Sequence, residues 1–401
     1  MSLPDARAPL IFAGLGHGLH HILTGLFPTV VLVLVPLWDL PYEELIALWT
    51  MGALLLGLGA PAAGWLADRW GEIPLMIAFY LGLGSSALAC GLSDGPLMLQ
   101  LGLAAMGLFG AIYHPVGTAW IVKNAIARGR AIAIVGVCGA VGVALASLVA
   151  AVLTDLGGWR LAFIVPGMLT FSAGMALIWF YATGGVADRR VDAHPIPDPD
   201  PTARRNTAII LVMTMCLTSI VWHAFATMLP KWLSLELASS LSQGLTGLGA
   251  LVTFVYLVGA IAQFIGGHFA DRGSAKQIYV ASFVLKLIAF LLALAVTGWP
   301  VVAVAAVIAL VFDIAAPVEN FLIAQYASAR RRGLTYGLRH GIAIVSAPLG
   351  VQIVSWLYHE GDGFGTLLLA LTLITLLILL ASLLLPADQS GAAPAAEAPR
   401  P

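Results

Sequence analysis

The chain has 401 residues, of which 60% are hydrophobic and only 10% are charged, and its mean hydropathy is +0.96. Because about a quarter of the residues of soluble domains are charged, this composition indicates a protein of the lipid bilayer. The formal net charge of -1 leaves no basic field of the kind that binds nucleic acid, so we expect no nucleic-acid partner. The three cysteines lie in apolar runs without metal-type spacing, which argues against a disulfide framework or a structural zinc site.

Apolar runs long enough to cross a bilayer recur along almost the whole chain. A spanning helix needs about 20 such residues, and we count twelve runs separated by short polar breaks. The sequence therefore predicts an all-α polytopic membrane protein with twelve transmembrane helices. The expected spans are 9–36, 44–67, 73–92, 96–122, 131–154, 160–182, 207–233, 243–270, 276–297, 300–327, 333–358 and 363–385.

A polar, proline-rich break divides these spans into six and six. Its prolines at 195, 197, 199 and 201 are typical of a solvated linker. We therefore predict an N-terminal six-helix bundle over 1–182, a cytoplasmic linker over 183–206 and a C-terminal six-helix bundle over 207–386. The Ala/Pro-rich segment 387–401 is expected to be a disordered C-terminal tail.

The positions of Lys and Arg predict the orientation, because cytoplasmic loops retain positive charge. With both termini in the cytoplasm, only Arg160 and Lys231 lie outside, while Lys286 and Arg339 fall within predicted spans. We expect a multi-pass protein of a bacterial-type inner (plasma) membrane. The residues placed inside are Arg7, Arg69, Lys123, Arg128, Arg130, Arg189, Arg190, Arg204, Arg205, Arg272, Lys276, Arg330, Arg331, Arg332 and Arg400.

The two halves of the chain repeat each other. The segment GWLADRWG at 64–71 recurs as GHFADRG at 267–273, a displacement of 203 residues. In the first and seventh spans His21 matches His223, displaced by 202 residues. Agreement between separate landmarks favours two parallel six-helix repeats over chance recurrence of loop residues.

The segment 64–71 resembles the signature loop of the major facilitator superfamily, and GWR at 158–160, which opens the sixth span, also resembles that superfamily. The resemblance covers the chain from the first span to the twelfth. It implies the major facilitator fold and a secondary transporter that functions as a monomer. In such transporters two bundles rock around a site near the middle of the bilayer, which is alternating access.

Within the superfamily, three segments resemble the fosmidomycin-resistance-like efflux branch. They are HGLHH at 17–21, YHP at 113–115 and the glycine-rich stretch 129–142. The branch commonly has an Asp where His21 stands and a Glu after the His-Pro pair, where this chain has Val116. Both departures remove a carboxylate, so the substrate and the coupling chemistry of the branch do not carry over.

The repeated loop predicts a conformational latch. A carboxylate at Asp68 can face the positive N-terminal end of a neighbouring helix across the seam between the halves, while Arg69 meets an acid or a lipid phosphate. Because such contacts exist in only one conformation, they bias the equilibrium, and by resemblance the state held is the outward-facing one. The alternative is a set of ordinary positive-inside anchors. The predicted latch residues are Gly64, Asp68, Arg69, Asp271 and Arg272.

Ionisable side chains within membrane spans are costly and by default mark functional sites. By resemblance, the first, fourth, seventh and tenth spans line the central pathway, and most of these side chains fall in those four spans. The predicted substrate and proton pathway contains His17, His20, His21, Thr24, His114, His223, Asp313, Glu319 and Asn320, together with Arg339 from the eleventh span.

Proton coupling is expected to involve His21 with Asp313 or Glu319. An imidazole titrates near neutral pH, and partial desolvation can bring a carboxylate into the same range. For each single histidine the alternative is a hydrogen-bonded packing residue, and for His114 the neighbouring proline strengthens that alternative.

Two basic residues lie within predicted spans. Arg339 favours an anionic group on the substrate, and Glu319 is expected to pair with Arg339 or His340, either as a gate or substrate clamp or as a static ion pair. Lys286 lies on a scaffold span, where snorkelling along lipid or pairing between helices is expected, so it is left out of the predicted site.

The sequence contains no P-loop, so transport is expected to draw on a gradient and not on ATP. No enzymatic activity, no cofactor and no resident metal ion are expected, and the partners are a small-molecule substrate, protons and the lipid bilayer. Proton-coupled efflux of a small organic solute is the leading prediction, with proton-linked uptake of a small organic anion as the first alternative. Transition-metal transport is the second, because histidines four apart on a helix match a metal-ligand spacing.

Overall fold

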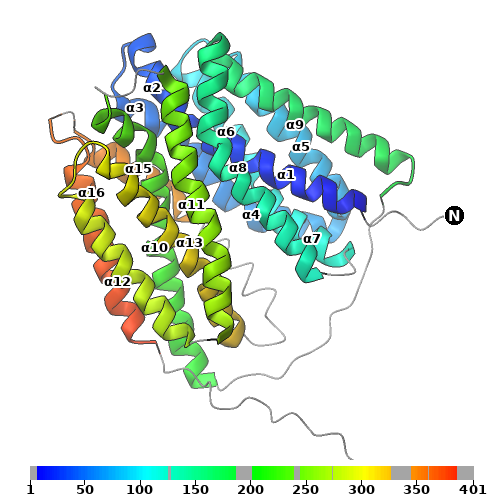
Figure 1. Cartoon of the computed structure of the whole chain (residues 1–401). Coiled ribbons are helices and arrows are strands. Elements are labelled where there is room, and N and C mark those ends of the chain that lie inside the picture. Colours follow the sequence, from blue (N-terminus) through cyan, green and yellow to red (C-terminus); the bar gives the residue numbers. More distant parts are fainter. Residues whose placement is uncertain are drawn as a thin grey trace, which may run out of the picture.

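The structure is a computed structural model that describes residues 7–124, 128–186, 201–238, 244–272, 274–326, 345–359 and 361–385. Over these residues the chain is almost wholly helical (Figure 1). Within this part of the chain ten helical stretches are long and apolar enough to cross a membrane. Two shorter apolar helices are described at Pro300–Ala315 and Ala347–Leu357, which accounts for the twelve expected spans.

In the N-terminal half, three of the six expected spans are each divided into two helices. The first span breaks at Leu26 because Pro28, in the first turn of the second helix, has no N–H for the preceding turn. The second span breaks at Leu48 and the fourth at residues 111–112. The helices are α1 (Arg7–Gly25), α2 (Phe27–Trp38), α3 (Tyr42–Ala47), α4 (Trp49–Trp70), α5 (Glu72–Gly91), α6 (Pro96–Gly110), α7 (Tyr113–Asn124), α8 (Arg128–Gly157) and α9 (Trp159–Ala182).

The C-terminal half contains longer, mostly unbroken helices. They are α10 (Pro201–Glu236), α11 (Gly244–Arg272), α12 (Ala275–Ala293), α13 (Pro300–Tyr326), α15 (Ala347–Leu357) and α16 (Gly365–Leu383). Helix α10 begins at Pro201, earlier than expected, so the last residues of the expected linker are helical. Residues 187–200 of that linker and residues 333–344 of the expected eleventh span lie outside the described residues.

Two single-residue turns explain glycines in the motifs. Gly71 joins α4 to α5 with φ 89° and ψ 163°, and Gly158 joins α8 to α9 with φ 91° and ψ 160°. This region of backbone conformation is essentially restricted to glycine. The last glycine of the segment 64–71 and the glycine of GWR are therefore required for the chain to reverse direction between adjacent spans.

Helix α1 is held closely among its neighbours. The Tyr113 hydroxyl donates to the Ala13 carbonyl at 2.7 Å, and Tyr80 donates in the same way to the Phe12 carbonyl. On the opposite side, a Cβ added to Gly142 of α8 would lie 2.4 Å from the Gly18 carbonyl oxygen. These contacts fix the face that α1 presents to α7 and α8.

The two halves join at one end of the molecule, which we call the closed end. There the Asp155 carboxylate accepts hydrogen bonds from the backbone N–H and the hydroxyl of Thr246, at 2.8 and 2.6 Å. The Ser355 hydroxyl donates across the same seam to the Glu43 carbonyl at 2.9 Å. From this end the two bundles diverge towards the end where α10 begins, which we call the linker end (Figure 1).

Basic side chains lie at both the closed end and the linker end. Arg160 donates to the Ser93 carbonyl at 2.9 Å beside the α8–α9 turn, and Lys231 lies 5.5 Å from the centre of the Tyr42 ring; both are at the closed end. At the linker end, Lys123 of α7 pairs with Glu72 of α5. This distribution agrees with the orientation that the sequence predicts, which stays a prediction.

Candidate functional site

Four histidines from two helices form one compact group in the N-terminal half, which we call the histidine cluster. His17, His20 and His21 come from α1, and His114 comes from α7. Ring centroids lie 4.9 Å apart for His17–His21 and for His20–His21, 5.0 Å for His20–His114, 5.4 Å for His17–His114 and 5.5 Å for His21–His114. The polar stripe predicted on the first span therefore continues across to the fourth span.

The local sequence explains how this group forms. Residues three and four apart share a helix face, so the three histidines of α1 project to one side. The His17 ring stacks on Tyr113 at 4.8 Å with an interplanar angle of 21°. A Cβ added to Gly139 of α8 would lie 2.4 Å from an atom of the same ring. Glycine at 139 is thus what allows the imidazole to lie against α8.

Hydrogen bonds orient two of these rings. His17 Nδ1 lies 2.8 Å from the Val135 carbonyl oxygen, and its Nε2 lies 3.1 Å from His21 Nε2. His20 is only 1% exposed, and its Nδ1 has no hydrogen-bond partner among the described residues. The Thr24 hydroxyl donates to the His20 carbonyl at 2.8 Å. The hydroxyl of this predicted pathway residue therefore bonds to the backbone of its own helix.

The C-terminal half holds a second polar group, which we call the charge cluster: Lys286 of α12 with Asp313 and Glu319 of α13. Lys286 is 0% exposed, and both carboxylates act on its ammonium electrostatically. The ammonium lies 3.7 Å from the centre of the Phe312 ring and 4.5 Å from that of Phe283. No hydrogen-bond partner of Lys286 Nζ occurs among the described residues.

Of the two expectations for Lys286, snorkelling along lipid is wrong, whereas interaction with a neighbouring helix agrees with the structure. A side chain with no exposed surface cannot reach the headgroup region, and here ring faces and carboxylates stabilise the ammonium inside the bundle instead. Lys286 was left out of the predicted site because the carboxylates near it, Asp313 and Glu319, come from another helix. The signal in the sequence that could have included it is the presence of a lysine in an otherwise apolar span.

Aromatic side chains from three helices surround this region. Trp222 of α10 lies 5.1 Å from Phe312 and 5.8 Å from Tyr256 of α11, measured between ring centroids. Tyr256 interacts electrostatically with Asp313, and a Cβ added to Gly259 would lie 2.4 Å from the Asp313 Oδ2 atom. The Asp313 carboxylate therefore lies directly against α11.

His223 connects the two halves. It lies on α10, and it is close enough to His21 of α1 for the two imidazoles to interact electrostatically. A Cβ added to Gly350 of α15 would lie 2.7 Å from His223 Cβ, so α15 fixes its other side. Of the predicted pathway residues, those of the first, fourth and seventh spans thus converge.

Several predicted residues fall outside the part of the chain that the structure describes. Arg339 and His340 lie outside it altogether, as do the side chains of Asn320, Asp271 and Arg272. The expected pairing of Glu319 with Arg339 or His340 therefore stays a prediction.

The first-half latch residues lie on α4 at the linker end. Arg69 places its guanidinium 3.9 Å from the centre of the Trp65 ring, one turn earlier on the same helix. Asp68 is exposed, and a Cβ on Gly64 would lie 3.7 Å from Pro115 Cβ of α7. The latch role of these residues stays a prediction.

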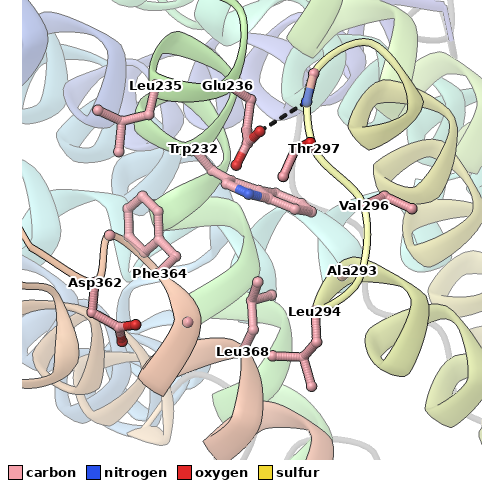
Figure 2. A pocket seen from close by; sticks show the side chains of 13 residues that line it. Trp232, Leu235, Glu236, Ala293, Leu294, Val296, Thr297, Asp362, Phe364 and Leu368 are labelled. Carbon is pink, nitrogen blue, oxygen red and sulfur yellow. Dashed lines mark hydrogen bonds between the residues drawn. The ribbon is translucent and has the colours of Figure 1, made fainter.

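A cavity of about 570 Å³ lies at the closed end of the C-terminal half (Figure 2). It is lined by Trp232 and Glu236 of α10, by residues 293–294 and 296–298, and by the start of α16 around Phe364. In Figure 2 the Glu236 carboxylate accepts a hydrogen bond from the Gly298 N–H, at 2.9 Å. None of the predicted pathway residues is among its lining side chains, so we do not assign this cavity to the solute pathway.

The sequence model of the Major Facilitator Superfamily matches residues 13–242 and again residues 211–401. The chain belongs to the Major Facilitator Superfamily. The two matches overlap over residues 211–242, and the resemblance seen in the segments 64–71 and 158–160 is confirmed at this level. The division into two six-helix bundles stays a prediction. The narrower resemblance to the fosmidomycin-resistance-like branch stays a prediction. As a member of this superfamily the protein is a membrane transporter and not an enzyme, as predicted.

Similar curated proteins are the Multidrug resistance protein B homologs of two Mycobacterium tuberculosis strains, CDC 1551 / Oshkosh and ATCC 25618 / H37Rv. Each is 29% identical over 131 residues, which is 32% of this chain and 24% of the relative. The match therefore spans about a quarter of the length of these relatives.

Two solved structures share the fold. Both are of a bacterial homolog of the human lysosomal transporter Spinster in an inward-facing conformation, one unoccupied and one occupied. The TM-scores are 0.72 and 0.73, at 15% and 14% identity, over 96% of this chain and 95% of each of those chains. The prediction of an all-α major facilitator fold is confirmed.

Proposed function

We propose that this transporter exports a small organic solute in exchange for protons, by alternating access. The observation that carries the proposal is the charge cluster, in which two carboxylates act on one fully buried lysine between membrane-spanning helices. Asp313 and Glu319 are the proton sites, and Lys286 is their charge partner. Because this proposal assigns proton binding to the two carboxylates, we assign His21 to the solute pathway.

The charge balance of this cluster supports proton binding. Counted over the described side chains, it contains one ammonium and two carboxylates, and Tyr256 of α11 interacts electrostatically with Asp313. Moving an ionised group out of water costs several kcal/mol, so a proton bound by one carboxylate changes that cost. The cluster then has two states that differ by one proton and by one unit of charge. A conformation that hydrates the cluster favours the charged state, and one that encloses it favours the neutral state.

The arrangement of the halves supports alternating access. If the linker is cytoplasmic, as the basic residues predict, the closed end faces outside and the structure is inward-facing. Transport then requires the contact between Asp155 and Thr246 to open. In the outward-facing state we propose that Asp68 and Arg69 engage across the linker end, with Asp271 and Arg272 as their counterparts and Gly64 at the packing surface.

The solute pathway runs between the histidine cluster and the charge cluster. We assign to it His17, His20, His21 and His114 in the N-terminal half, with Thr24 one turn further along α1. In the C-terminal half we assign His223 to this pathway, and we propose that Asn320 and Arg339 also line it. The aromatic rings around Trp222 offer apolar and π surfaces to an organic solute.

The proposed direction of transport is supported by similarity to known proteins. Export agrees with the name of the Mycobacterium tuberculosis relatives, Multidrug resistance protein B homolog, to which a third of this chain is similar. Proton-linked uptake of a small organic anion is the second candidate, because a guanidinium at Arg339 favours an anionic group on the substrate. We propose a monomer in a bacterial-type inner membrane, with both termini cytoplasmic.

Solute flux in liposomes tests the proposal. The protein is reconstituted with an imposed pH gradient, and the accumulation of radiolabelled antibiotics and organic acids is followed. The expected result is uphill movement of one solute class, opposite to the proton flow, that collapses when the gradient is dissipated. Asp313→Asn is expected to abolish uphill movement, whereas Asp39→Asn at the end of α2 leaves it intact. Movement that follows the solute gradient alone, whatever the pH gradient, would contradict the proposal.

A further inference from the structure

The nitrogen atoms of three histidines converge in the N-terminal half. One ligand atom from each of His17, His21 and His114 can be chosen so that all three lie within 4.8 Å of one another. The Nε2 atoms of His17 and His21 are 3.1 Å apart. Two imidazole nitrogens bound to one tetrahedral zinc, each at about 2.0–2.1 Å, lie about 3.3–3.4 Å apart. This pair already has the spacing of two ligands, and the third nitrogen needs to approach by at most about 1.4 Å.

The orientation of His17 is that of a metal ligand. A carbonyl oxygen only accepts hydrogen bonds, so His17 Nδ1 carries the proton that it donates to Val135 at 2.8 Å. That tautomer leaves the Nε2 lone pair directed at His21. A ring N–H donated to a backbone carbonyl is the arrangement that fixes metal-binding histidines and raises their basicity.

A second observation comes from His20. Its ring is 1% exposed and its Nδ1 has no hydrogen-bond partner among the described residues. A buried polar atom without a partner costs about 1–3 kcal/mol, yet this ring lies 4.9 Å from His21 and 5.0 Å from His114. An imidazole with an unused nitrogen beside the other three offers a fourth nitrogen by changing its ring orientation.

The chemistry of the donors selects the ion. Imidazole suits zinc, copper, nickel and iron, whereas magnesium and calcium require oxygen ligands. All three converging donors are imidazoles on the half-buried side chains of two helices. The site therefore discriminates against the abundant hard cations by ligand type alone.

We propose that His17, His21 and His114 bind a divalent transition-metal ion, with a further coordination position open to His20 or to a donor atom of a small organic ligand. The inference deepens the proposed function and rests on it in one respect: because the histidine cluster belongs to the solute pathway, the transported organic solute is a small chelator that crosses as its complex with the metal ion.

Metal binding to the purified protein tests the site. The protein is prepared without a histidine tag and titrated with Co²⁺, whose visible absorption reports tetrahedral nitrogen coordination, and with Zn²⁺ by calorimetry. One ion per chain is expected. His17→Ala, His21→Ala and His114→Ala are each expected to weaken binding at least about 10-fold, and His359→Ala at the closed end serves as the control. Absence of binding, or binding that survives in the triple variant, would overturn the proposal.

A glycine pair provides a test that changes no ligand. Gly139→Ala places a Cβ 2.4 Å from the His17 ring, whereas Gly136→Ala, one turn earlier on the same helix, meets no atom within 4 Å. The first variant is expected to weaken Co²⁺ binding about 10-fold and the second to leave it unchanged. Equal affinity in both would contradict the role of the His17 ring. Where an alanine variant does not fold, His17→Gln and His21→Gln replace it.

The outcomes separate the two proposals. If Co²⁺ does not bind while a pH gradient drives an organic solute uphill, the metal site falls and the proposed function stands. If Co²⁺ binds with the expected losses while no solute or metal moves under a pH gradient, the site stands and proton-coupled transport falls.

Discussion

Replacing Lys286 by methionine removes the ammonium that interacts electrostatically with the buried Glu319 carboxylate and the half-buried Asp313 carboxylate. Breaking a direct buried ion pair costs about 3–5 kcal/mol, and we expect the low end of this range because Lys286 Nζ has no hydrogen-bond partner among the described residues. Loss of the cation–π contact with Phe312, at 3.7 Å, is worth about 2 kcal/mol when desolvated, but the two terms overlap and do not add. The methionine side chain retains part of the apolar packing. We therefore expect a net loss of about 3 kcal/mol in the free energy of unfolding.

Thermal unfolding in detergent measures this loss. A change of 1 kcal/mol shifts Tm by about 2–4 °C for a cooperative unit of 150–250 residues, so Lys286→Met should lower Tm by about 6–12 °C. Adding Glu319→Gln returns the cluster to its original net charge and should recover more than half of the loss. Lys231→Met, at the closed end, is the matched control.

The reasoning fails if Lys286→Met lowers Tm by less than about 2 °C. It also fails if Glu319→Gln deepens the loss instead of recovering it, because charge balance would then not be the term that governs the cluster.

Three further predictions concern the turns and the closed end. Gly71→Ala forces alanine into a conformation with φ 89° and should cost about 1–3 kcal/mol of stability, measured as a lower Tm. Asp155→Ala removes both hydrogen bonds from Thr246. At this exposed position we expect a loss of about 1 kcal/mol and a roughly fivefold shift towards the externally open state, measured by impermeant thiol labelling of a cysteine introduced behind the contact. The pKa of Asp362 is lowered from 3.8, first by a hydrogen bond from the Thr366 side chain and then by one from its backbone. Because the folded-state pKa is depressed, the stabilisation is present above pH 3.8 and is lost as the pH falls through the lowered pKa, so the Tm difference between wild type and Asp362→Asn should vanish at acid pH.

Matched variants make these predictions specific. Gly95→Ala introduces a Cβ that meets no atom within 4 Å, on backbone with an extended φ of -173°; a Tm loss equal to that of Gly71→Ala would contradict the conformational argument. Asp94 pairs with Arg160 within the N-terminal half, so labelling that rises equally in Asp94→Ala would remove the closed-end contact as the cause. A Tm difference for Asp362→Asn that persists unchanged into acid would refute the role of its carboxylate.

Composition and periodicity were enough to predict the architecture. Spans of about 20 apolar residues can only be helices in lipid, because every backbone N–H and C=O must be satisfied within the segment. The segment 64–71 and its repeat at 267–273 added the twofold organisation. Helix spacing also predicted that His17 and His21 share a face, since residues four apart do so in any α-helix.

Contacts between helices were not predictable in the same way. The approach of His114 to the α1 histidines depends on how α7 packs on α1, which the spacing within either helix does not determine. For Lys286 the sequence left two roles open, snorkelling along lipid and pairing between helices. Its partners Asp313 and Glu319 lie on α13, and no local pattern reports that α12 and α13 bring them together.

Proton movement linked to solute movement tests the central claim most directly. Liposomes that contain the reconstituted protein and a trapped pH-sensitive dye are given the transported solute, with no imposed pH gradient. We predict that the internal pH changes in proportion to the solute that crosses. In Asp313→Asn/Glu319→Gln the pH change should disappear, while exchange of labelled for unlabelled solute continues. A pH change of unaltered size in that variant would contradict proton coupling through the charge cluster.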